Sequence, residues 1–229
     1  MGGVDEVLTM RMRIVIISTV FLAVGWGVPK DNQLTSEEKK EGFSLLFNGK
    51  NLKGWEGDAE RWKVENGILV GSSDGKPFKV NTFLIHEGTF SNFILKGEIK
   101  LRNHNSGIQF RSERILGEGW ILKGYQADAS EVDDQKSAWG NFYEERGRGR
   151  GTMKTPDQGW LVAKSIVRHG DWNSYEILAD GKHIRLTFNG VVTIDTHDSQ
   201  ASRGLIGLQL HAGPEMRVEF RNLKLKRLP

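Results

Sequence analysis

The chain has 229 residues, enough for one large domain or two small ones. With 38% hydrophobic and 27% charged residues, its composition is that of a globular protein and excludes the collagen-like, disordered and multi-span membrane classes. Cysteine is absent, which excludes disulfides, Cys-ligated zinc and a thiol nucleophile. The net charge of +3 is a small excess of 32 basic over 29 acidic residues, so we expect no nucleic-acid partner.

An apolar run near the N-terminus has the features of an export signal. Arg11 and Arg13 precede apolar residues 14–24, a run too short to span a bilayer comfortably. Gly25 and Gly27 then offer small residues for cleavage. We therefore expect residues 1–27 to be a signal peptide, with the mature protein in the periplasm or cell envelope and without a stable membrane span. An uncleaved anchor or a buried first strand is the alternative.

The remaining chain divides into a polar segment and one domain. Residues 28–41 are polar and charged, and we interpret them as a linker with a short helix capped by Thr35 or Ser36. From residue 42 to residue 229 there is no second linker, composition shift or repeat of fixed period. This pattern predicts a single domain over 42–229.

Alternation of apolar and polar residues recurs throughout this domain. The alternating segments are 62–65, 68–70, 93–101, 175–179, 183–188, 191–194 and 216–226. Turn dipeptides separate several of them, as Asn66-Gly67 and Asn189-Gly190 do. No segment keeps an apolar helical period for more than about two turns. The many short strands and the 28 Gly predict an all-β protein, an antiparallel β-sandwich or jelly roll.

Three of the predicted strands carry unusual polar faces. Alternation predicts that Ile108, Phe110, Leu208 and Leu210 point into the core. Their neighbours on the opposite faces are then Gln109 with Arg111, Gln126 with Asp128, and Gln209 with His211. These side chains form directional hydrogen bonds, unlike the Lys, Glu, Thr and Ser that are usual on a solvent face. In one sheet they would form a polar surface suited to a sugar; ordinary solvated positions are the alternative.

A fourth segment, residues 139–151, joins aromatic residues and carboxylates to a Gly-spaced basic loop. One interpretation places Glu144 as an acid or base at the rim of a cleft. Trp139 and Tyr143 would then stack on a sugar, and Arg146 or Arg148 would bind an oxyanion. The alternative is a strand end that continues into a solvated loop. The His residues show no metal-ligand spacing, and no Gly-x-Ser-x-Gly elbow is present.

Together these motifs resemble the 3-keto-disaccharide hydrolase domain family. The matching stretches follow family order over residues 42–229 and include GFSLLFNGKNLKGW (42–55), WKVENGIL (62–69), NSGIQFR (105–111), GYQAD (124–128), WGNFY (139–143), GDWN (170–173), GLQLH (207–211) and VEFRN (218–222). The resemblance implies a concanavalin A-like lectin/glucanase jelly roll with a substrate cleft on its concave sheet. It also implies action on glycosides oxidised at C3. Residues 125–129 and the Glu-Glu-Arg loop depart from the pattern of many relatives, so the fold is a safer expectation than the activity.

A ketone at C3 acidifies the C2 proton and places the glycosidic oxygen β to the carbonyl. The glycosidic C1–O bond can therefore break by elimination, and water can add afterwards. Such a site needs a base, an acid and a group that stabilises the enolate. Asp128 or Glu144 is expected as acid or base, His211 as a proton shuttle and Arg111 on the enolate. Gln109, Gln126, Gln209, Trp139, Tyr143 and Arg146 are the expected substrate-binding residues.

The sequence is compatible with more than one mechanism and more than one function. Two-carboxylate hydrolysis competes with elimination as the mechanism. No cofactor is required, although a divalent cation in place of Arg111 is an alternative. The carboxylates and His211 favour an enzyme over a non-catalytic carbohydrate-binding module on the same fold, and both over an adhesion domain without a small ligand. The expected partner is a carbohydrate.

Overall fold

Two antiparallel β-sheets pack face to face. The computed structural model describes residues 30–132, 139–147 and 159–229, so the expected signal peptide lies outside the described residues. One sheet contains β1 (Ser44–Leu45), β3 (Trp62–Glu65), β4 (Ile68–Ser72), β6 (Phe93–Leu101), β10 (Asn173–Asp180), β11 (His183–Phe188), β12 (Val191–His197) and β14 (Arg217–Arg227). The other contains β2 (Trp55–Glu56), β5 (Thr82–Phe90), β7 (Asn105–Arg114), β8 (Leu122–Ser130), β9 (Phe142–Glu145) and β13 (Gly204–Leu210).

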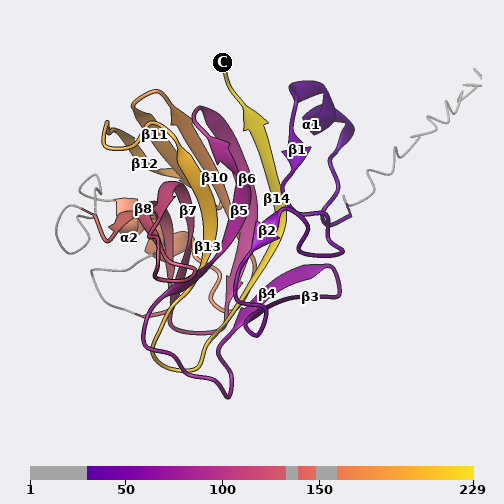
Figure 1. Cartoon of the computed structure of the whole chain (residues 1–229). Coiled ribbons are helices and arrows are strands. Elements are labelled where there is room, and N and C mark those ends of the chain that lie inside the picture. The colour runs from indigo at the N-terminus through magenta and orange to yellow at the C-terminus, as the bar shows by residue number, and fades with distance from the viewer. Residues whose placement is uncertain (1–29, 133–138, 148–158) are drawn as a thin grey trace, which may run out of the picture.

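The strand orders are β12-β11-β10-β6-β14-β4-β3, with β1 on β14, in the eight-stranded sheet and β2-β5-β13-β7-β8-β9 in the six-stranded sheet. The two helices in the described residues are α1 (Ser36–Glu41) and α2 (Gly159–Ile166). Figure 1 shows the two sheets as layers with α1 and α2 outside them. The predicted antiparallel sandwich is confirmed. No helix in the described ranges has both the length and the apolarity to cross a membrane.

Two-residue turns set the register of the hairpins. Asn66 and Gly67 join β3 to β4 with φ values of 50° and 80°, and Asn189 and Gly190 join β11 to β12 with 47° and 83°. Both turns need two residues with positive φ, and Asn followed by Gly adopts this conformation at low cost. The hairpins predicted at these dipeptides are confirmed.

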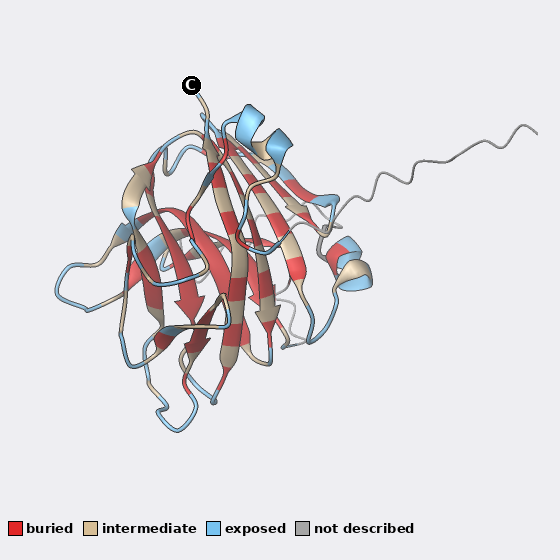
Figure 2. Ribbon diagram, turned by 90° about the vertical axis from the view of Figure 1, so that its right-hand side faces the viewer, coloured by how far each residue is buried: buried red, intermediate tan, exposed pale blue. Residues whose placement is uncertain are grey.

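The core lies between the sheets and follows from the alternation along each strand. Ile108 and Phe110 of β7 and Leu208 and Leu210 of β13 are all fully buried in one apolar cluster, as predicted. Figure 2 shows buried residues along the strands of both sheets and exposed residues mainly in the connecting loops. Because the even-numbered residues of β7 and β13 point inward here, Gln109 and Gln209 point to the outer face of the six-stranded sheet.

The polar segment before the domain packs against it. Thr35 caps α1 in a capping box with Glu38, and Gly42 ends the helix with φ 88°. Glu38 also accepts a hydrogen bond from Lys224 of β14 (2.6 Å). Of the segment expected to be a linker, the described part from residue 31 onwards is therefore held on the eight-stranded sheet, and the expected cap at Thr35 is confirmed.

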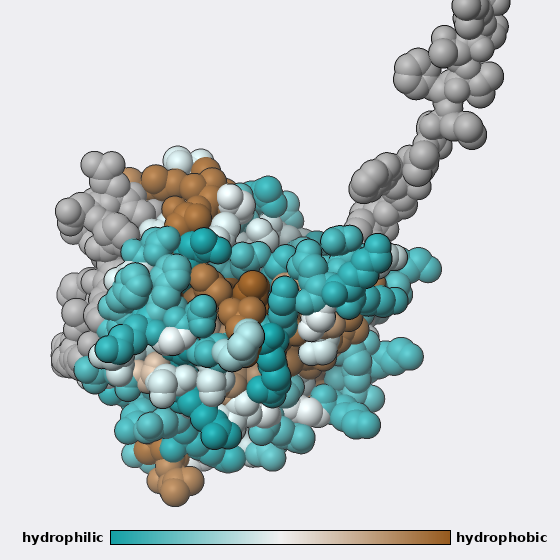
Figure 3. Space-filling model, turned by 90° about the horizontal axis from the view of Figure 1, so that it is seen from above, coloured by the Kyte–Doolittle hydropathy of each residue, from teal (hydrophilic) through white to brown (hydrophobic). Residues whose placement is uncertain are grey.

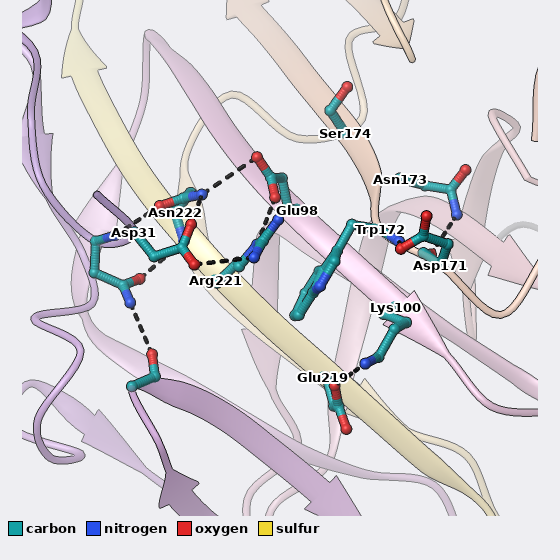
Figure 4. A network of polar contacts seen from close by, with 12 residues as sticks. Asp31, Glu98, Lys100, Asp171, Trp172, Asn173, Ser174, Glu219, Arg221 and Asn222 are labelled. Carbon is teal, nitrogen blue, oxygen red and sulfur yellow. Dashed lines mark hydrogen bonds and ion pairs between the residues drawn. The ribbon is translucent and has the colours of Figure 1, made fainter. Parts of the chain in front are cut away.

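The outer face of the eight-stranded sheet is a network of paired charges (Figure 4). Trp172 lies between two cations, with Lys100 5.1 Å and Arg221 4.1 Å from its ring. Lys100 pairs with Glu219 and Arg221 with Glu98, each at 2.6 Å. Trp172, in the GDWN stretch, thus has a packing role at the entry of β10. From the end of the sandwich where the C-terminus lies, apolar side chains reach the surface in separate areas among hydrophilic ones (Figure 3).

Candidate functional site

A tract of buried polar side chains runs across the outer face of the six-stranded sheet. Its members come from four strands: Gln109 of β7, Gln126 and Asp128 of β8, Gln209 of β13 and Glu145 of β9. None is more than 8% exposed. Sheet register brings them together, since Gln109 lies opposite both Gln126 of β8 and Gly207 of β13. The structure therefore unites the Gln and Asp residues that the sequence singled out on three separate strands.

Directed hydrogen bonds connect the two carboxyls of this tract. Gln126 donates from Nε2 to Asp128 Oδ1 (3.1 Å) and to Gln209 Oε1 (3.4 Å), and Gln209 donates from Nε2 to Glu145 Oε2 (3.4 Å). Asn105 also donates to Asp128 Oδ1, at 3.2 Å. We call the series Asp128–Gln126–Gln209–Glu145 the amide relay. Both of its ends are acceptors, which fixes the orientation of each amide.

Within this polar tract, three buried amide atoms have no hydrogen-bond partner among the described residues. They are Nε2 and Oε1 of Gln109 and Oε1 of Gln126. A buried polar atom without a partner costs about 1–3 kcal/mol, and most such atoms in proteins are satisfied. Adjacent free donors and acceptors suit a ligand with several hydroxyl groups.

An open pocket of about 540 Å³ lies at one end of the relay. Its lining consists of Phe78, Lys79, Val80, Asn81, Glu145, Arg146, His211, Ala212 and Gly213. This volume is in the range of small-molecule sites. We call it the mouth pocket; it brings the expected His211 and Arg146 to the end of the polar tract.

Asn81 bonds to Glu145 and to the backbone next to His211 in the mouth pocket. Its Nδ2 donates to Glu145 Oε1 (3.2 Å), and its Oδ1 accepts from the backbone N–H of Ala212 (2.9 Å), the residue after His211. Burial raises the pKa of Glu145, against the lowering effect of its hydrogen bonds and of Arg146. Burial also lowers the pKa of His211. Both shifts favour the uncharged forms, a protonated carboxyl and a neutral imidazole.

Tyr143 adds a hydrogen-bond donor beside the carboxyls. It lies opposite Gln126 in the β8–β9 pairing and on the same face as Glu145. Burial raises the pKa of Tyr143, and the nearby Glu145 and Asp128 raise it further. Its phenol therefore remains protonated over the neutral pH range.

Of the pair Glu144-Glu145, the structure places Glu145 on this face, whereas Glu144 was the acid or base expected from the sequence. Phe142 is buried in the core, so Glu144, two residues later, shares its side of β9. Glu145 occupies the outer face with Tyr143 and reaches the mouth pocket. Alternation from Phe142 is the signal that would have identified Glu145.

The structure does not bring Arg111 to the site. A bulge in β7 between Phe110 and Glu113, with Arg111 at φ 46°, interrupts the alternation that predicted its direction. Its guanidinium instead donates to loop groups at the far end of the sandwich. These are the carbonyls of Ser91 (2.8 Å), Gly181 (2.7 Å) and Ala201 (3.2 Å) and Oδ1 of Asn92 (3.2 Å). Arg111 therefore ties turns together and is not available to an enolate in the mouth pocket.

Of two other residues expected to bind the substrate, Trp139 lies in the core and Arg146 lies at the mouth pocket. Trp139 is 3% exposed and stacks on Phe188 of the eight-stranded sheet (5.6 Å between centroids), so it belongs to the core and not to a sugar-binding rim. Arg146 is exposed at the mouth pocket and pairs with Glu118 (3.1 Å). Arg148, the alternative to Arg146, lies outside the described residues. In the part of the chain that the structure describes, no three His, Asp or Glu side chains are grouped as a metal site.

Comparison with known families agrees with the motifs in the sequence. The profile of the 3-keto-alpha-glucoside-1,2-lyase-like domain matches residues 42–226. The chain belongs to this family. No curated protein matches it significantly.

Solved structures similar to this member of the 3-keto-alpha-glucoside-1,2-lyase-like family share its fold. A candidate glycosyl hydrolase from Parabacteroides distasonis is 24% identical, with a TM-score of 0.65 over 87% of this chain and 100% of that chain. A Bacillus subtilis protein with a galectin-like fold is 12% identical (TM-score 0.55, 77% and 90% covered). The alginate lyase Aly36B is 11% identical (TM-score 0.51, 82% and 93% covered). These likenesses establish the jelly-roll sandwich.

Proposed function

We propose that this protein cleaves glycosides oxidised at C3, by elimination across C1 and C2 followed by addition of water. The observation that carries the proposal is that Glu145 and His211 line one pocket, where Asn81 bonds to Glu145 and to the backbone N–H of Ala212, the residue after His211. Burial raises the pKa of Glu145 and lowers the pKa of His211, and these directions favour a carboxyl that can give a proton and an imidazole that can accept one. The family description, a 1,2-lyase-like domain acting on a 3-keto-glucoside, supports the same chemistry.

The reaction needs one base and one acid. His211 removes the proton from C2, and the electron pair moves into the conjugated system with the C3 ketone. The C1–O bond then breaks, and the leaving oxygen takes its proton from Glu145. Water adds at C1 of the resulting unsaturated ketone, and C2 regains a proton, so the net change is hydrolysis of the glycosidic bond.

The surrounding polar groups bind the sugar and the enolate. Tyr143 keeps its proton and can donate to a developing enolate oxygen. Gln109 is fully buried and does not line the mouth pocket, so we assign its unpartnered amide to a sugar that enters the polar tract from that pocket, where it would accept from one hydroxyl group and donate to another. Asp128 orients Gln126, and through it Gln209, and is not assigned a proton-transfer step.

Turnover in D2O tests the proposal directly. The purified protein is incubated with α- and β-linked 3-keto-glycosides and with the unoxidised parent sugars. Elimination and hydration predict release of the aglycone from the keto sugars only, with solvent deuterium at C2 of the sugar product. Cleavage without deuterium at C2, or cleavage of the unoxidised sugars, would support two-carboxylate hydrolysis. Binding without any cleavage would support a carbohydrate-binding module.

We also propose that the protein acts outside the cytoplasm, in the periplasm or cell envelope. The support is the sequence of the N-terminus, where two Arg precede a short apolar run and small residues follow it. N-terminal sequencing of the protein from its native envelope should find a start near Trp26 or Val28. An intact N-terminus in a cytoplasmic fraction would contradict export.

A further inference from the structure

Two histidines of different loops approach one backbone carbonyl at the mouth pocket. His104 Nε2 lies 3.0 Å from the oxygen of Ala212, and His211 Nδ1 lies 2.6 Å from the same oxygen. The rings meet edge to face, with centroids 4.6 Å apart. A carbonyl oxygen only accepts hydrogen bonds, so each of these two nitrogens must carry a hydrogen.

We infer that His104 is a positioning residue that holds the His211 ring against the Ala212 carbonyl, so that His211 carries its proton on Nδ1 and presents Nε2 as the proton acceptor. This inference rests on the proposed function, in which His211 is the base. His211 Nε2 makes no hydrogen bond to any described residue. A neutral imidazole needs one fixed N–H to have a defined acceptor on the other nitrogen.

The backbone is shaped to allow this arrangement. His104 ends the turn between β6 and β7 with φ 69°, a conformation that is uncommon for a residue other than Gly. Gly213 has φ 124°, and a Cβ at that position would lie 3.0 Å from His104 Nε2. The hydrogen bond from His104 to the Ala212 carbonyl thus has a strained backbone at His104 and a closely packed glycine beside Ala212. These features indicate that the surrounding fold enforces the geometry.

The same peptide also fixes the position of the base relative to the acid. The Ala212 carbonyl accepts from the two histidines, while the Ala212 N–H donates to Asn81, which in turn donates to Glu145. One peptide unit therefore orients His211 on one side and is linked to Glu145 on the other. Loss of His104 would release one side of this arrangement without touching Glu145.

The titratable groups around His211 come from four segments. They are His104 of the β6–β7 turn, Glu145 of β9, Arg146 after β9 and Lys79 before β5. Burial lowers the pKa of His211, the Ala212 carbonyl opposes this effect, and His104 adds to the lowering. Removing the His104 ring should therefore move the pKa of His211 upward.

The tautomer can be measured without any substrate. Long-range 1H–15N NMR of 15N-histidine-labelled protein should show His211 protonated at Nδ1 in the parent, and a mixture of tautomers in His104→Ala. His104→Asn, which tolerates the left-handed backbone and keeps an N–H donor, should restore part of the Nδ1–H signal. His183→Ala is the matched control, since it removes one ring of the His183–His197 stack on the other sheet. Nε2–H in the parent, or an unchanged tautomer in folded His104→Ala, would overturn the inference.

Kinetics on a 3-keto-glycoside give the second readout. His104→Ala should lower kcat on the order of tenfold, with KM within about twofold. It should also raise the apparent pKa of the low-pH limb of the rate profile, which reports the ionisation of the base His211. An unchanged pH profile and rate in a folded variant would contradict the positioning role. If no 3-keto-glycoside is cleaved but the Nδ1–H tautomer depends on His104, the proposed function fails and the positioning stands.

Discussion

Asn32 and Asn222, 190 residues apart, exchange hydrogen bonds: each donates its backbone N–H to the side-chain oxygen of the other, at 2.6 and 2.9 Å. Both have φ 55°, and Asn32 also donates from Nδ2 to the carbonyl of Gly67 (2.7 Å). Figure 4 shows Asn222 beside Asp31 and Arg221 in the same network. The segment before α1 is thereby fixed to the last strand and to the β3–β4 turn.

Substitution of Asn32 should measure this attachment. Asn32→Gly keeps the left-handed backbone but loses two side-chain hydrogen bonds, so we expect a loss of about 2 kcal/mol in the free energy of unfolding. Asn32→Ala should cost about 1 kcal/mol more, because Ala is disfavoured at positive φ. Urea denaturation gives both values. If Asn32→Gly and Asn222→Gly have fully additive effects, the exchanged bonds do not contribute as one unit.

Glu145 and its neighbour Glu144 form a matched pair for activity. Glu145→Gln removes the proposed acid and should lower kcat on 3-keto-glycosides on the order of 10²-fold or more. Glu144→Gln, on the other face of β9, should retain activity within about threefold of the parent. Substrates with a more acidic leaving group need less protonation, so they should recover part of the Glu145→Gln rate. Equal losses in the two variants would remove Glu145 from the acid role.

The raised pKa of Glu145 should also affect stability. The unfolded chain has the ordinary Glu pKa of about 4.3, and burial raises the pKa of the folded state. As pH rises from about 4.3 through the folded pKa, the unfolded state ionises first, so the parent loses stability across this window. Glu145→Gln does not titrate there. The stability of the parent relative to this variant should therefore fall with rising pH and then level off; a pH-independent difference in urea denaturation would contradict the shift.

Arg111 should prove structural. The guanidinium of Arg111 donates to three carbonyls and to Asn92, and the single ammonium of a lysine cannot replace all of these hydrogen bonds. We therefore expect Arg111→Lys to lose at least about 3 kcal/mol in the free energy of unfolding. Below its melting temperature the variant should keep the kcat of the parent. Arg203→Lys is the exposed control, and its stability should match the parent. If kcat falls in the folded Arg111→Lys variant, the result would instead support a catalytic role for Arg111.

The fold was predictable because its signals are local. Asn66-Gly67 and Asn189-Gly190 impose turns that few other dipeptides adopt, and alternation around Ile108 and Leu208 fixes which side of each strand is buried. The packing of residues 31–41 was not predictable, because it depends on Asn32 meeting Asn222, a contact across most of the chain that no local pattern encodes.

The site was predictable only where alternation held. Gln109, Gln126 and Gln209 follow the period of two and meet on one face. Arg111 lies within a bulge, which changes the direction of a side chain without leaving a clear mark in the sequence. Trp139 is an ordinary core residue. The sequence alone does not distinguish a Trp in the core from a Trp at the rim of a sugar-binding cleft.

Gln109 should lower the stability of the fold and strengthen binding of the sugar. Its buried amide has no partner among the described residues, so Gln109→Met, of similar volume, should stabilise the fold by about 1 kcal/mol. The variant should also lose the hydrogen bonds to the sugar and raise KM by about tenfold or more.

Gln126→Met is the matched control for Gln109→Met. Gln126 donates to Asp128 and to Gln209, so its loss leaves two buried acceptors without that donor and should destabilise the fold by about 2 kcal/mol. Thermal unfolding and initial rates on one 3-keto-glycoside separate the two variants. If Gln109→Met destabilises the protein as much as Gln126→Met, then the Gln109 amide has partners in the folded protein and is not reserved for a ligand. If it stabilises the protein and leaves KM unchanged, Gln109 does not contact the substrate.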